Sequence, residues 1–190
     1  MKNLFTLPDN LPVPEDDGAC NHLKGIKFPE LNILSTDDRE INFGYEKGIS
    51  VIYFYPMIGH PNSPPMDGWN DIPGARGCTT QSCEYMNHYS ELIHLGVKNV
   101  FGASAQEIEQ QKESRERLHL PFELLNDSEF KLVNALKLPT FYYKDKKLIK
   151  RLTLIIENSL IIEVFYPVFP PNENAERVIE WLKKNRPKSR

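Results

Sequence analysis

The chain has 190 residues, of which 40% are hydrophobic and 26% are charged, and its net charge is −3 at pH 7. This length fits one domain whose core needs no disulfide or metal to stay folded. The charge gives no reason to expect a nucleic acid as a partner, and no apolar run approaches the ~18 residues that a membrane span needs. Because there are only three cysteines and no apolar leader segment, we predict a cytoplasmic protein.

The first half of the chain divides into an arm, a strand and a long loop. Residues 1–25 are rich in proline and acidic side chains, which predicts an extended arm on the surface, and residues 26–190 form the predicted domain. The segment FPELNIL at 28–34 is a candidate strand. The run ISVIYFY at 49–55 is apolar at nearly every position, which is typical of a strand covered on both faces. A proline-rich inserted loop follows at about 56–77.

The second half of the chain alternates between helical and extended patterns. Apolar residues recur with helical spacing between Cys78 and Leu95. The further predicted elements are a strand at 97–104, a charged helix at 105–118, a short helix at 130–136, a hairpin of strands at 151–156 and 160–166, and a closing helix at 175–182. This order predicts an α/β fold of the thioredoxin-like class, with a mixed central sheet and helices on both faces.

Two of the three cysteines, Cys78 and Cys83, lie five positions apart in the segment IPGARGCTTQSC. Cys78 falls at the predicted N-terminus of a helix, where the helix dipole and nearby cations favour the reactive thiolate. Gly74 and Gly77 would let backbone N–H groups approach a reacting atom. Arg76 is a local cation, and Arg151, which opens an apolar strand, needs an anionic partner if it is buried. This pattern indicates redox chemistry.

The spacing of the two cysteines sets a geometric constraint. On an intact α-helix, five residues rise about 7.5 Å and rotate about 140°, so the two Cα atoms lie roughly 8–9 Å apart. A disulfide needs a Cα separation of about 4.4–6.8 Å. Cys78 and Cys83 therefore cannot be bridged unless the first turns of the helix unwind.

Other interpretations of the same residues stay open. Cys78 could be an inert core thiol, Cys83 a bystander, and Arg151 an ordinary surface ion-pair residue. A metal site built from Cys78, Cys83 and His88 is disfavoured, because structural zinc sites prefer C-x2–4-C pairs and four ligands. Cys20 lies in an acidic stretch that disfavours a thiolate, so we expect no catalytic role for it. We expect Trp69 to pack within its loop or, as a weaker alternative, to line a substrate pocket.

Several segments together resemble one family, the peroxiredoxins. The matching segments, within about residues 26–184, are Phe54-Tyr55-Pro56, Gly77-Cys78-Thr79, Gln81, Cys83, VFGAS at 100–104, LPFELLND at 120–127 and Arg151-Leu152-Thr153. The C-x4-C spacing is similar to the Q-type branch, also called bacterioferritin comigratory proteins. Taken together, these segments are specific for the family, whereas the two cysteines alone would not be.

The resemblance implies a thiol-dependent peroxidase that reduces hydrogen peroxide and organic hydroperoxides. It implies that Cys78 is the peroxidatic cysteine, that Cys83 resolves its sulfenic acid as an intramolecular disulfide, and that Arg151 stabilises the thiolate and the peroxide. Further expected substrate-binding residues are Pro56, Arg76, Gly77 and Thr79. A thioredoxin-type reductant would reopen the disulfide. No cofactor, metal, nucleic acid or membrane is expected, and the chain is expected to be a monomer or a weak homodimer.

The sequence departs from the family pattern just before Cys78. The family has a proline seven residues before this cysteine and a threonine three residues before it, where this chain has Asp71 and Ala75. The hydroxyl of that threonine helps to place the peroxide in the family. Thr79, Ser63 and the side chain of Arg76 are the candidate substitutes.

Two rival functions remain. A disulfide oxidoreductase acting on proteins would need a C-x-x-C site, which is absent. A peroxide-sensing redox switch or interaction protein would keep the thiols without efficient turnover, and would signal through the N-terminal arm and the long loop.

Overall fold

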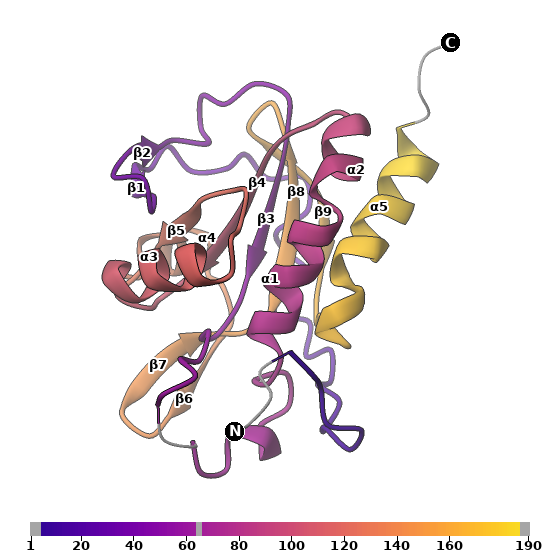
Figure 1. Cartoon of the computed structure of the whole chain (residues 1–190). Coiled ribbons are helices and arrows are strands. Elements are labelled where there is room, and N and C mark those ends of the chain that lie inside the picture. Colours follow the sequence, from indigo (N-terminus) through magenta and orange to yellow (C-terminus); the bar gives the residue numbers. More distant parts are fainter. Residues whose placement is uncertain (1–4, 64–65, 187–190) are drawn as a thin grey trace.

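A five-stranded mixed sheet forms the centre of the protein in the computed structural model, which describes residues 5–63 and 66–186 (Figure 1). Its strand order is β5 (Leu124–Asn126), β4 (Val97–Ser104), β3 (Ile49–Phe54), β8 (Leu152–Glu157) and β9 (Leu160–Phe165). β3 pairs in parallel with β4 and antiparallel with β8, and every residue of β3 is buried. The predicted mixed sheet and its doubly covered strand are confirmed.

Helices cover this sheet on both faces, as predicted. On one face lie α1 (Cys78–Asn87), α2 (Tyr89–His94) and α5 (Asn174–Asn185), with α1 beside α5 (Figure 1). The other face is covered by α4 (Lys131–Leu136), and α3 (Ile108–Arg117) lies next to the edge strand β5. The chain therefore has the α/β architecture of the thioredoxin-like class.

Alternate side chains of β3 divide the core into two apolar clusters. Val51 and Tyr53 join the cluster under α1, α2 and α5, which also contains Cys78, whereas Ile52 and Phe54 join the cluster under α4. Because successive side chains of a strand point to opposite faces, one apolar run supplies both cores. Cys78 thus lies on the α1 side of the sheet.

The helix predicted over 78–95 is interrupted. α1 ends at Asn87, the backbone of His88 leaves helical geometry (φ −96°, ψ 5°), and α2 begins at Tyr89. The apolar pattern continues through the break because Tyr85 and Leu92 are both fully buried on the same face of the sheet. Periodicity alone therefore could not reveal the interruption.

Two predictions about extended segments were wrong or incomplete. The candidate strand at 28–34 is limited to β1 (Ile33–Leu34), which pairs with β2 (Glu40–Ile41). A separate hairpin of β6 (Thr140–Tyr143) and β7 (Lys146–Ile149) was not predicted. Most of its side chains are exposed or half-buried, so the segment lacks the continuous apolar signal of a core strand.

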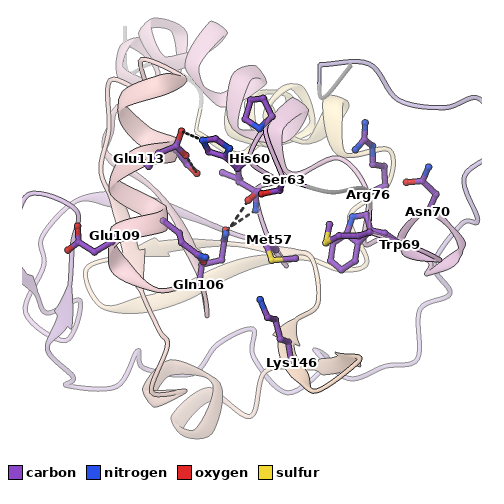
Figure 2. A pocket seen from close by; sticks show the side chains of 16 residues that line it. Met57, His60, Ser63, Trp69, Asn70, Arg76, Gln106, Glu109, Glu113 and Lys146 are labelled. Carbon is purple, nitrogen blue, oxygen red and sulfur yellow. Dashed lines mark hydrogen bonds and ion pairs between the residues drawn. The ribbon is translucent and has the colours of Figure 1, made fainter. Parts of the chain in front are cut away.

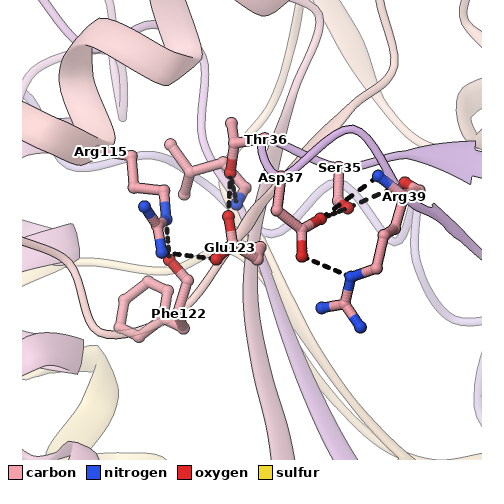
Figure 3. Close-up of polar contacts among 8 residues, drawn as sticks. Ser35, Thr36, Asp37, Arg39, Arg115, Phe122 and Glu123 are labelled. Atoms are coloured by element: carbon pink, nitrogen blue, oxygen red, sulfur yellow. Dashed lines mark hydrogen bonds and ion pairs between the residues drawn. The ribbon is translucent and has the colours of Figure 1, made fainter.

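A polar cluster fastens the edge strand β5 to the rest of the domain (Figure 3). The hydroxyl of Thr36 donates to the carboxylate of Glu123 over 2.6 Å and accepts the N–H of Leu124 over 3.0 Å. Arg115 of α3 donates to the same carboxylate and to the carbonyl of Phe122. α3 and the segment after β1 are thereby joined at the start of β5.

The N-terminal segment contributes to the core, which the sequence analysis did not anticipate. Cys20 and Leu23 are 4% and 0% exposed and belong to the cluster under α4. The surrounding acidic side chains are exposed, so a stretch rich in polar residues still buries these two side chains. The proposed boundary between an arm of residues 1–25 and a domain of residues 26–190 stays a prediction.

In its described residues, 56–63 and 66–77, the long loop contains one 3-10 turn, η1 (Trp69–Asp71). Trp69 is buried and its ring packs edge-on against Tyr143 of the β6–β7 hairpin, with ring centroids 5.1 Å apart. Loop packing, the favoured interpretation of Trp69, is therefore observed. In the described ranges no helix is both long and apolar enough to cross a membrane.

Candidate active site

Cys78 is the first residue of α1, as the sequence predicted, and a glycine at the N-cap makes this position possible. Gly77 has φ +108°, a conformation that side chains rarely adopt. A Cβ atom there would lie 2.3 Å from Cγ of Pro171 and 3.0 Å from Cδ2 of Leu7. The close approach of these two segments to the start of α1 therefore requires glycine.

The sulfur of Cys78 is buried, faces two hydrogen-bond donors and lies 3.6 Å from the carbonyl oxygen of Ala75. The side chain is 4% exposed. Sγ lies 3.2 Å from Nη2 of Arg151 and 3.4 Å from the backbone nitrogen of Met57, the third residue after the end of β3. The helix N-terminus, the guanidinium and the amide all favour negative charge on this sulfur.

The guanidinium of Arg151 is held by uncharged acceptors. Its nitrogens donate to the carbonyl oxygens of Gly74, Ala75 and Arg76 over 3.1–3.3 Å, and Nη1 donates to Oε1 of Gln81 over 2.5 Å. The side chain is only 3% exposed, and no carboxylate of the described residues forms an ion pair with it. A thiolate on Cys78 would therefore be the anion in contact with this buried cation.

Cys83 lies on the same helix and is half-buried against the apolar cluster that contains Cys78. Burial raises the pKa of its thiol, with a smaller contribution from the neighbouring Glu84. Both cysteines are free thiols, and α1 is continuous between them. The helical spacing of roughly 8–9 Å between their Cα atoms therefore applies, and it exceeds the reach of a disulfide.

The other predicted site residues surround Cys78 in different ways. Pro56 is buried and directly precedes Met57, the residue whose N–H reaches the sulfur. Thr79 is buried in the first turn of α1, but it is the hydroxyl of Thr80 that donates to the carbonyl of Gly77, over 2.8 Å. Arg76 donates to the carbonyl of Thr6 over 3.5 Å, so Arg151 supplies the guanidinium at the sulfur.

A cavity of about 950 Å³ lies beside the active-site loop (Figure 2). Met57, Ile58, Met66 and Trp69 give it an apolar part, and its polar lining includes His60, Ser63, Arg76, Gln106 and Lys146. Trp69 thus both packs in the loop and lines a cavity. Met57 and Arg76 connect this cavity to the surroundings of Cys78.

A second cavity, of about 470 Å³, is also lined by residues of this loop, among them Ile72, Pro73 and Gly74. It is lined by Gly74, Arg151, Val168 and residues of the N-terminal segment such as Pro14. Residues of the loop that precedes Cys78 therefore line two cavities.

Three groups at this site were not assigned by the sequence analysis. Met57 contributes a backbone amide, for which a sequence carries no signal. Gln81 was part of the matched motif, and its spacing of three residues from Cys78 places it one helical turn away on the same side. Asn174 accepts a hydrogen bond from Gln81 over 2.9 Å from a distant part of the chain, and nothing in the sequence linked the two.

The chain is similar to several known proteins. A family model described as Redoxin matches residues 23–179. The chain is 26% identical over 161 residues to a putative chloroplastic peroxiredoxin Q of Oryza sativa subsp. indica, covering 84% of this chain and 66% of that protein, and 28% identical over 139 residues to peroxiredoxin Bcp of Bacillus subtilis, covering 71% and 78%. The crystal structure of peroxidoxin BcpB from Mycobacterium tuberculosis superimposes with a TM-score of 0.70 at 18% identity, covering 87% of this chain and 99% of that one.

The chain belongs to the Redoxin family, since the matched segment spans most of its length. Within that family it is similar to proteins named peroxiredoxin Q and Bcp, and its fold is that of the solved peroxiredoxin Q and BcpB structures. The chain spans slightly less than two thirds of the rice relatives. The plant relatives are named chloroplastic, so the cytoplasmic location stays a prediction, as does the monomeric or weakly dimeric state.

Proposed function

We propose that this protein is a thiol peroxidase in which Cys78 attacks hydroperoxides. The single observation that carries the proposal is the sulfur of Cys78 at the N-terminus of α1, 3.2 Å from a buried guanidinium that has no carboxylate partner among the described residues. Such an environment favours the thiolate, and the thiolate is the nucleophile in peroxide reduction.

The proposed first step is a displacement at oxygen. The Cys78 thiolate attacks one oxygen of the hydroperoxide, an S–O bond forms and the O–O bond breaks. The departing oxygen leaves with the bonding electron pair and takes up a proton as water or an alcohol, while the cysteine becomes a sulfenic acid. The guanidinium of Arg151 and the N–H of Met57, which already face the sulfur, would stabilise the negative charge as it moves to the leaving oxygen.

The proposed second step forms a disulfide. The Cys83 thiol condenses with the sulfenic acid, an S–S bond forms, and one water is released. A thioredoxin-type dithiol then reduces the disulfide and is itself oxidised. Because both cysteines are on an intact helix, the first turn of α1 must unwind between the two steps.

The cavity bears on the choice of hydroperoxide. Pro56, Arg76, Gly77 and Thr79 remain the proposed substrate-binding residues, and the apolar side chains near Met57 would accommodate the organic part of an alkyl hydroperoxide as well as hydrogen peroxide. Ala75 provides no hydroxyl at the position of the family threonine. Ser63 and Arg76 line the cavity and Thr79 adjoins Cys78, so all three stay candidates for that role.

A coupled assay with a thioredoxin system tests the proposed function. Cys78→Ser is expected to abolish peroxide consumption, while Cys20→Ala, which removes a thiol from the opposite face of the sheet, should consume peroxide like the unmodified chain. Unchanged turnover in Cys78→Ser would refute the proposal. Stoichiometric oxidation without turnover would instead identify the redox-switch alternative.

A further inference from the structure

A buried relay of hydrogen bonds leads from Arg151 to the first residue of α5. Nη1 of Arg151 donates to Oε1 of Gln81, and Nε2 of Gln81 donates to Oδ1 of Asn174 over 2.9 Å. The three side chains are 3%, 0% and 0% exposed. Asn174 is therefore connected to the guanidinium at Cys78 by hydrogen bonds through one intervening side chain.

The chemistry of Arg151 sets the direction of every bond in this relay. A guanidinium only donates hydrogen bonds, so Gln81 must turn its carbonyl oxygen to Arg151 and its amide nitrogen to Asn174. Asn174 must then present Oδ1 to Gln81. The orientation of the Asn174 amide is thus dictated by the cation two side chains away.

The side-chain oxygen of Asn174 accepts several hydrogen bonds, whereas its amide nitrogen donates none in the described part of the chain. Oδ1 also accepts the hydroxyls of Tyr85 and Thr153, each over 2.8 Å. Nδ2, in contrast, is buried without a hydrogen-bond partner in the described part of the chain, which costs free energy. An aspartate would accept the same three bonds with more lone pairs and leave no buried donor unpaired. Hydrogen bonding alone would therefore favour aspartate here.

Charge explains why the residue is asparagine. Arg151 has no carboxylate partner in residues 5–63 and 66–186, and a carboxylate at position 174 would add an anion one side chain away from the guanidinium. We propose that Asn174 is a positioning residue that orients Gln81 and Arg151 through a neutral acceptor, so that the Cys78 thiolate remains the one anion served by this guanidinium. The inference rests on the proposed function in taking Cys78 as the reacting thiol.

The other charged and titratable groups near the relay do not compete with the Cys78 thiolate for Arg151. Cys78 and Tyr85 contact the relay directly, Tyr53 stacks on Tyr85, Tyr55 lies near Cys78, and the Glu173–Arg177 pair flanks Asn174 in the chain. Burial raises the pKa of Tyr85, and it raises that of Tyr55 to about 12, so both phenols are neutral at physiological pH. Glu173 and Arg177 are exposed and paired with each other over 3.0 Å.

The substitution Asn174→Asp tests the proposal because it keeps the shape and the acceptor oxygens while adding charge. The ultraviolet absorbance of the thiolate should show the Cys78 titration midpoint moving up by about one pH unit. The second-order rate with hydrogen peroxide at pH 7 should fall about 10-fold and recover at higher pH. Asn134→Asp, the same change at an exposed position of α4, should move neither quantity. A midpoint unchanged by Asn174→Asp would overturn the proposal.

A double-substitution cycle keeps the proposal testable if Asn174→Asp folds poorly. If the new carboxylate competes with the thiolate for Arg151, Asn174→Asp should lower the free energy of unfolding less when Cys78→Ser is also present. Equal destabilisation in both backgrounds, or folding in neither, would show that the amide is only structural. If the unmodified chain consumed no peroxide, the proposed function would fail, yet the thiolate titration would still decide the role of Asn174.

Discussion

Nη2 of Arg151 lies 3.2 Å from Sγ of Cys78, although 73 positions separate the two residues in the chain. The same nitrogen also contacts the carbonyl oxygens of Ala75 and Arg76, three and two positions before the cysteine. Arg151 therefore supplies positive charge to the sulfur and also fixes the loop that carries it. These two roles separate experimentally, because a lysine retains the charge but not the planar set of donors.

Arg151→Lys is expected to lower the second-order rate with hydrogen peroxide about 100-fold at pH 7, because one ammonium cannot serve the sulfur, three carbonyls and Gln81 together. Stopped-flow measurement of Cys78 oxidation would give the rate. Arg177→Lys, at an exposed position of α5, is the matched control and should react like the unmodified chain. A normal rate for Arg151→Lys would show that charge alone is sufficient.

Oxidation with one equivalent of peroxide is expected to link Cys78 to Cys83 and to unwind the first turn of α1. Tyr85 should hold the second turn in place, because its ring stacks on Tyr53 with centroids 4.3 Å apart and its hydroxyl bonds Asn174. Hydrogen exchange read by mass spectrometry should therefore accelerate over residues 78–83 and much less beyond Tyr85. Peptide mapping should find the Cys78–Cys83 link.

Cys83→Ser provides the control for this oxidation. Without the second thiol the helix should stay protected, and Cys78 should accumulate as sulfenic or sulfinic acid. A link between Cys78 and Cys20, or faster exchange over 78–83 in the oxidised Cys83→Ser chain, would contradict the predicted resolution step.

The parts of the fold with strong local signals were predictable from the sequence. The apolar run at 49–55 and the tight Glu157-Asn158-Ser159 connection predicted β3 and the β8–β9 hairpin, which the structure contains. The β6–β7 hairpin was missed because it is held by its own pairing and by contact with Trp69, not by burial of a continuous apolar strand.

The site was predictable only in part. The position of Cys78 at a helix start followed from the glycines and the change in periodicity, and both are local features. The contact with Arg151 had no local signal, since it depends on how β8 pairs with β3, and that pairing is decided by the whole sheet. Asn174 reaches Gln81 only because α5 packs against α1, so its place in the site needed the tertiary structure.

Gly77→Ala is expected to destabilise the fold by about 2–4 kcal/mol, because strain at positive φ adds to a clash with Pro171. Gly96→Ala is the matched control, since Gly96 has φ +91° but open space where a Cβ would lie. It should cost only the backbone strain of about 1–2 kcal/mol. Chemical denaturation gives both values. Equal losses would mean that Pro171 moves aside freely and that the start of α1 is not tightly enclosed.

The three thiols are expected to differ sharply in alkylation because their environments differ. Burial, with help from Asp17, raises the pKa of Cys20 to about 12, so this group stays a neutral thiol in the folded chain. An unfolded cysteine ionises near pH 8.5, so between that pH and about 12 the unfolded chain binds fewer protons and the folded state loses stability as the pH rises. At pH 7–9 iodoacetamide should modify Cys78 first and Cys83 more slowly, with Cys20 reacting only after denaturant is added. Mass spectrometry of timed samples would show the order, and early modification of Cys20 in the folded protein would contradict its burial under α4.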